Sequence, residues 1–92
     1  MTTYIIAFDS NQVVDYKGFQ QAVDNISFGA WIKPTHSQFI IRTSQKSEQI
    51  RDALGAYLPS SDQFFVARID LTDWASRGVS NEIMGALKDK FF

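Results

Sequence analysis

The sequence predicts a single α+β domain, residues 1–92, in which helices pack on a four-stranded antiparallel sheet. Two observations lead to this class. Four short runs are rich in β-branched and aromatic residues, whereas three longer stretches repeat apolar residues at helical spacing. The length suits one compact domain, and 45% hydrophobic with 21% charged residues is the composition of a globular chain.

The first half of the chain predicts a strand, a helix and a hairpin. The apolar run 3–8 is a strand that ends at the turn-forming residues 9–11. A helix is expected over 16–25, because one helical face carries Phe19, Ala22, Val23 and Ile26. Strands are expected at 29–33 and 37–43, with a proline between them that cannot donate to a sheet ladder.

The second half predicts a helix, a strand and a last helix. Ser44 or Ser47 is the expected N-cap of the second helix, and Pro59 closes it. Its apolar face is Ile50, Ala53, Leu54, Tyr57 and Leu58. A fourth strand covers 63–71, and Ser80 is the expected N-cap of a third helix with the apolar residues Ile83, Met84, Leu87 and Phe91.

The predicted order is therefore βαββαβ followed by a helix, which is the order of a ferredoxin-like sandwich with one added C-terminal element. In that fold the first strand lies between the third and the fourth and runs antiparallel to both. The two main helices cover one face of the sheet.

The predicted strands are apolar on both faces, although a two-layer sandwich needs only one apolar face. In the first strand, for example, Ile6 and Phe8 point to one side while Ile5 and Ala7 point to the other. Large exposed apolar side chains would forfeit about 1.5 to 3 kcal/mol each. We therefore expect a homodimer that buries the second face. The alternative is a monomer whose third helix folds back across the sheet.

One rim of the predicted sheet gathers polar residues from distant parts of the sequence. The end of the first strand and the starts of the third and fourth bring together Asp9, Ser10, His36, Ser37 and Asp62. A carboxylate with hydroxyls and an imidazole could hold a hard cation such as magnesium, or position a general base. The alternative is that these residues only build turns, with His36 in solvent at a hairpin tip.

Composition excludes several classes of site. The chain has no cysteine and one histidine, which excludes thiol catalysis, disulfides and multi-histidine zinc centres. A net charge of −1 gives no indication of nucleic-acid binding. No apolar run reaches the length of a membrane helix and the start lacks a basic signal region, so the expected location is the cytoplasm, without a membrane partner.

Five segments carry a resemblance to a known family: 3–9, 30–41, 47–54, the Ser-Asp pair at 61–62 before an apolar strand, and Trp74. Together they resemble the SinR-like small proteins, which are similar to the CRISPR-associated Cas-two subunits and to VapD-type ribonuclease toxins. The resemblance implies a ferredoxin-like homodimer. It also implies that the aspartate ending the first strand, here Asp9, lies near the two-fold axis, where a pair of such residues binds a metal.

The resemblance leaves two functions open. The first is a metal-dependent endoribonuclease or DNase of toxin–antitoxin or CRISPR-associated type, in which Asp9 of two protomers holds magnesium and a metal-bound water attacks phosphorus. The second is a dimeric, non-catalytic relative in bacterial or phage defence. The lack of a basic surface and the helix at the C-terminal end, where Cas-two subunits have a strand, favour the second function.

Overall fold

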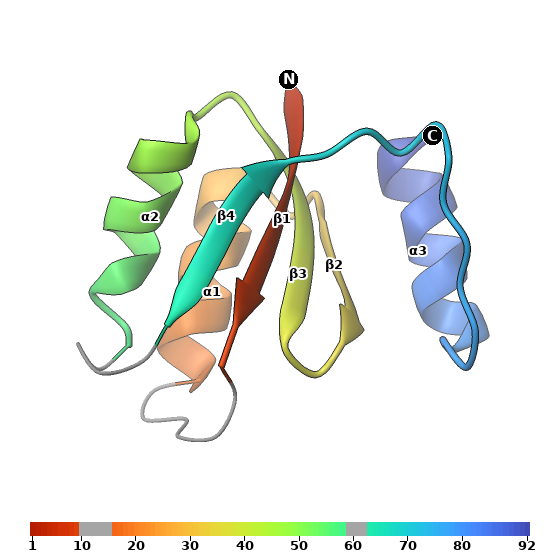
Figure 1. Cartoon of the computed structure of the whole chain (residues 1–92), viewed down its shortest axis with the longest axis horizontal. Coiled ribbons are helices and arrows are strands. Elements are labelled where there is room, and N and C mark those ends of the chain that lie inside the picture. Colours follow the sequence, from red (N-terminus) through yellow and green to blue (C-terminus); the bar gives the residue numbers. More distant parts are fainter. Residues whose placement is uncertain (10–15, 59–62) are drawn as a thin grey trace.

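A computed structural model describes residues 1–9, 16–58 and 63–92, which form one four-stranded sheet and three helices (Figure 1). The strands are β1 (Thr2–Phe8), β2 (Trp31–Thr35), β3 (Gln38–Thr43) and β4 (Phe64–Arg68). The helices are α1 (Tyr16–Ser27), α2 (Ser47–Gly55) and α3 (Asn81–Phe91). The predicted α+β class and the antiparallel four-stranded sheet are confirmed.

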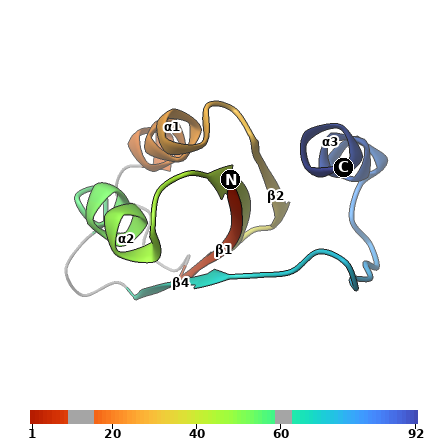
Figure 2. The same cartoon turned by 90° about the horizontal axis from the view of Figure 1, so that it is seen from above.

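The sheet has the strand order β2-β3-β1-β4, so β1 lies between β3 and β4 and is antiparallel to both. The helices α1 and α2 lie together on one side of the sheet (Figure 2). The strand β2 lies between α1 and α3, so α3 is on the opposite side of the sheet from the other two helices. We call the side that faces α1 and α2 the first face, and the other side the second face.

The hydrophobic core fills the space between the first face and the helices α1 and α2. Every second residue of β1 from Tyr4 on, and of β3 from Phe39 on, points into it and is fully or almost fully buried. Three rings form its centre, with centroid separations of 5.3 to 5.7 Å among Phe8, Phe19 and Phe39. Aromatic rings at this spacing add stabilisation beyond the area that they bury.

Helix α1 is longer than the sequence predicts, and it ends through a left-handed turn. Ile26 is buried and the Ser27 hydroxyl donates to the carbonyl of Val23 at 2.7 Å, which extends the helix to Ser27. Phe28 then has φ of 52° and Gly29 has φ of 81°, and the Gly29 amide donates to the Asp24 carbonyl at 3.1 Å. The bond from Gly29, which follows the left-handed Phe28, closes the helix as in a Schellman motif.

This turn also moves β2 along the chain relative to the prediction. Gly29 belongs to the helix end, so the strand starts at Trp31 and includes Pro34. The proline is tolerated because β2 is an edge strand and because its register with β3 shifts between Ile32 and Thr35. The prediction that residues 34–36 separate the two strands is therefore wrong for 34 and 35.

Helix α2 differs from the prediction at both ends. Its N-cap is Lys46, not Ser44 or Ser47, and the Lys46 amide donates to the side chain of Gln49 at 2.9 Å. The helix ends at Gly55, before the predicted closure at Pro59, which lies outside the described residues. Strand β4 is also shorter than predicted and ends at Arg68.

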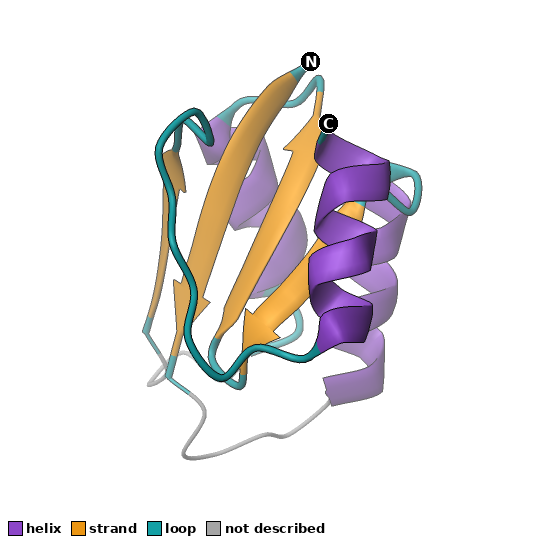
Figure 3. Ribbon diagram, turned by 90° about the vertical axis from the view of Figure 1, so that its right-hand side faces the viewer, coloured by secondary structure: helices purple, strands orange, loops and turns teal. Residues whose placement is uncertain are grey.

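The segment that leads to α3 runs along the second face. From the end of β4 it crosses toward α3 and then runs lengthwise beside α3 before that helix begins (Figures 1 and 3). The N-cap of α3 is Ser80, as predicted, and its hydroxyl accepts from the Ile83 amide at 3.2 Å. The helix folds back onto the second face, in line with the monomer alternative, but its contacts with the sheet are mainly at β2.

Candidate functional site

The predicted polar rim lies at the end of β1. The Asp9 amide donates to the Gln63 carbonyl at 3.0 Å, and the Phe8 amide donates to the Ser37 carbonyl at 2.9 Å. These two bonds hold the end of β1 between the chain entering β3 and the chain entering β4. Asp9 is exposed and lines a shallow concavity together with Gln63 and the neighbouring strand residues.

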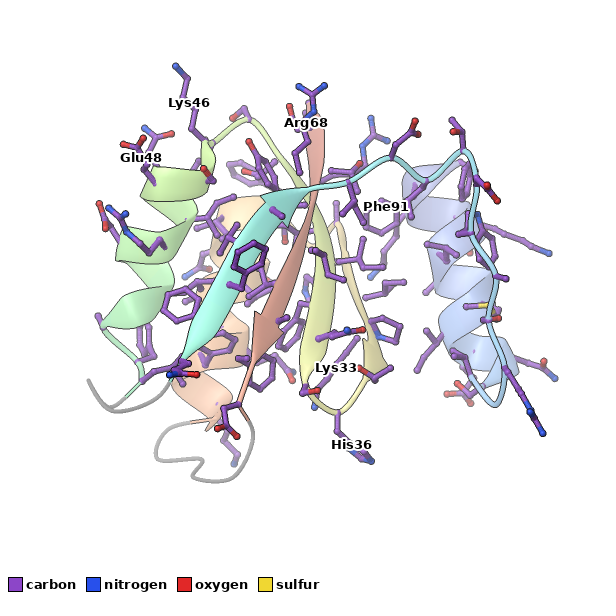
Figure 4. All side chains as sticks on the ribbon, in the orientation of Figure 1. Lys33, His36, Lys46, Glu48, Arg68 and Phe91 are labelled. Carbon is purple, nitrogen blue, oxygen red and sulfur yellow. The ribbon has the colours of Figure 1, made fainter. Side chains whose placement is uncertain are left out.

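His36 does not face into this rim. It is exposed in the turn between β2 and β3, and in Figure 4 it points away from the sheet at the tip of the hairpin. Ser10 and Asp62, the other two predicted members, lie outside the described residues. Within residues 1–9, 16–58 and 63–92, no three His, Cys, Asp or Glu side chains are grouped closely enough to hold a metal ion.

The second face carries a continuous apolar surface over β1 and β4, which we call the β1–β4 stripe. It consists of four side chains, Ile5, Ala7, Phe65 and Ala67. Ile5 pairs with Ala67 and Ala7 pairs with Phe65 across the two strands, so the four form two adjacent rows. Phe65 is 67% exposed and the other three are half-buried.

Neither α3 nor the segment before it covers this stripe in full. Figure 1 shows β4 and β1 with no helix in front of them, while α3 lies beside β2. Proteins rarely leave several adjacent apolar side chains open to water, because each loses the free energy of burial. The stripe is therefore a candidate interaction surface, with Phe65 as its exposed side chain.

Helix α3 covers the β2 end of the second face. Lys90 of α3 places its ammonium nitrogen 3.2 Å from the Trp31 carbonyl and 5.7 Å from the centre of the Trp31 ring. The indole nitrogen of Trp31 donates to Asp24 of α1 at 2.8 Å. Trp31 thus connects the helices on the two sides of the sheet and acts as a packing residue.

Between β2, β3, the 69–80 segment and α3 the structure contains a cavity that the sequence did not predict. Ile32 and Ile40 line it from the sheet, and Met84 and Leu87 line it from α3. The signal was present in the apolar residues of the second face and in the apolar spacing of α3. The sequence does not show that these two sets of residues line one cavity, because the path of residues 69–80 decides which of them meet.

Comparison with protein-family models, curated proteins and solved structures finds no match to this chain. The helices in the described part of the chain are too short or too polar to cross a membrane.

Proposed function

We propose that this chain is a non-catalytic, dimeric module of ferredoxin-like fold, in which a second copy covers the β1–β4 stripe. The element order βαββαβα and the strand order β2-β3-β1-β4 support the fold assignment. The observation that carries the proposal is the stripe itself, with Phe65 at 67% exposure. The setting in bacterial or phage defence rests on the resemblance to the SinR-like and Cas-two proteins.

A second copy is the proposed partner for two physical reasons. The stripe contains no charged side chain, so two copies of it can meet without bringing like charges together. The net charge of −1 gives little repulsion between whole molecules. A two-fold axis through the stripe would stack Phe65 and Ala7 of one protomer on the same residues of the other.

The test is the molar mass of the full chain by sedimentation equilibrium over a range of concentrations. We expect a dimer at micromolar concentration and a monomer for Phe65→Lys, because a charge placed in the stripe has no partner on burial. Phe28→Lys is the matched control, since Phe28 is an 87% exposed aromatic residue that lies after α1, away from the second face. A monomeric mass for the unchanged chain at high concentration would refute the proposal.

A metal-dependent nuclease remains the alternative, and it rests on Asp9 and the resemblance. The exposed position of Asp9 at the end of β1 leaves its carboxylate near solvent, where a nucleic acid could reach it. The chain carries 9 basic against 10 acidic residues, and this low positive charge favours the non-catalytic proposal.

A further inference from the structure

The cavity under α3 is enclosed mainly by apolar side chains. Its volume is about 300 Å³, at the lower end of the range for small-molecule sites. The second face of the sheet forms one side of it, and α3 with the 69–80 segment forms the other. The principal apolar residues are Ile32, Ile40, Leu71, Trp74, Met84 and Leu87.

One cation lies at the opening of this cavity. Arg77 lines the cavity and is also exposed, so it stands where the cavity meets solvent. Arg77 makes no ion pair with any residue that the structure describes. The polar side chains of Gln38 and Ser76 also line the cavity.

We propose that this cavity binds a small amphiphilic carboxylate, with its hydrocarbon chain among the apolar side chains and its head group on Arg77. A guanidinium can bind a carboxylate through two parallel hydrogen bonds. The apolar walls supply affinity for the chain through burial. A cavity of about 300 Å³ has room for a short alkyl chain that carries a carboxylate, such as octanoate.

This inference is independent of the proposed dimer. The cavity is lined by residues of β2, β3, α3 and the 69–80 segment, whereas the stripe lies on β1 and β4. Phe65→Lys is therefore expected to abolish the dimer and to leave binding in the cavity unchanged. Failure of one proposal does not entail failure of the other.

The test is titration calorimetry of the full chain with three probes. Octanoate has both the chain and the carboxylate, octylammonium has a similar chain with the opposite charge, and acetate has the carboxylate without the chain. We expect measurable binding of octanoate, at least tenfold weaker binding of octylammonium, and no detectable binding of acetate.

Two variants locate the site. Arg77→Gln is expected to weaken octanoate binding by about tenfold, the loss that follows when a charge-assisted pair is removed. Ala75→Trp places a large ring in the cavity from an exposed position and is expected to abolish binding of octanoate. Arg51→Gln is the matched control, because Arg51 is an exposed arginine of α2, remote from the cavity.

Several results would overturn the proposal. These are an absence of octanoate binding at millimolar concentration, equal binding of octanoate and octylammonium, or octanoate affinity that is the same in Arg77→Gln as in the unchanged chain. Circular dichroism of each variant shows whether it is folded. If Ala75→Trp is folded and dissociates a dimer while octanoate affinity stays unchanged, the cavity is a contact between copies and the ligand proposal is wrong.

Discussion

At the scale of single residues, isoleucine side chains on the two faces of the sheet differ in how deeply they are buried. Ile6 of β1 is fully buried in the core, whereas Ile40 of β3 is half-buried beside the cavity on the second face. We expect Ile6→Ala to lower the free energy of unfolding by about 2 to 5 kcal/mol. Ile40→Ala removes a side chain that is only half-buried, so it should lower the free energy of unfolding by about 1 kcal/mol. Urea unfolding of both variants measures the difference, and equal losses would show that the second face is as closely packed as the core.

Asp9 is the residue at which the non-catalytic proposal and the nuclease alternative make different predictions. For a non-catalytic module, titration with magnesium should not induce cleavage of RNA or DNA, and Asp9→Ala should behave like the unchanged chain. Cleavage that appears with magnesium and disappears in Asp9→Ala would establish the nuclease alternative instead. Asp24→Ala does not serve as a control, because Asp24 accepts a hydrogen bond from Trp31. Asp52→Ala is suitable, since Asp52 is exposed on α2 and its hydrogen bond is with the exposed side chain of the adjacent Arg51.

At the scale of the elements, substitution of two serines tests where the helices α2 and α3 begin. Ser80 caps α3 through its hydroxyl, so Ser80→Ala should lower the free energy of unfolding by about 0.5 to 2 kcal/mol. Ser47, one of the two predicted N-caps of α2 beside Ser44, lies inside the helix after the Lys46 cap. Ser47→Ala is therefore expected to leave thermal stability nearly unchanged. A larger loss for Ser47→Ala than for Ser80→Ala would contradict both assignments.

Substitution of two lysines of α3 tests how this helix packs on the sheet. Lys90 contacts the Trp31 carbonyl and ring, whereas Lys88 is also exposed in the last turn but has no such contact in the described structure. Lys90→Met should destabilise the fold by about 0.5 to 1 kcal/mol through loss of the cation–π contact. Lys88→Met should have a smaller effect. The measurement is urea unfolding followed by tryptophan fluorescence, and equal effects would mean that Lys90 contributes nothing specific.

The type and order of the seven elements within the described residues could be predicted from the sequence, because apolar spacing distinguishes helices from strands. Several boundaries could not. The end of α1 depends on the left-handed turn at Phe28 and Gly29, and that turn decides that β2 begins at Trp31. A lysine at the N-cap of α2 has no sequence signal of its own, since the capping contact comes from the Gln49 side chain.

The candidate sites were less predictable than the fold. The convergence of Asp9 and Ser37 follows from strand order, which element order already indicates. The orientation of His36 away from the rim depends on the geometry of the hairpin turn. The cavity near Arg77 depends on the path of a long connection with little regular structure, and such a path leaves no periodic signal in a sequence.

At the scale of the whole molecule, the nature of the proposed dimer interface sets its response to salt. The β1–β4 stripe is apolar and uncharged, so its association should depend on burial and not on ion pairs. Adding sodium sulfate to about 0.5 M should lower the dissociation constant of the dimer, because excluded salts strengthen apolar burial. Sedimentation equilibrium at several sulfate concentrations measures this. Weaker association in sulfate would indicate an interface held by charges.

The position of β1 in the sheet has a consequence for how the protein is made. The first strand of the chain lies in the interior of the sheet, and its two neighbours are β3 and, much later in the sequence, β4. During synthesis, the pairing of Ile6 with Phe39 becomes available well before the pairing of Phe8 with Phe64. Until β4 has left the ribosome, one backbone edge of β1 is open to other chains. The last part of the sheet to form is also the part that carries Phe65, so a chaperone that binds exposed apolar strands would meet this protein at β1 and β4.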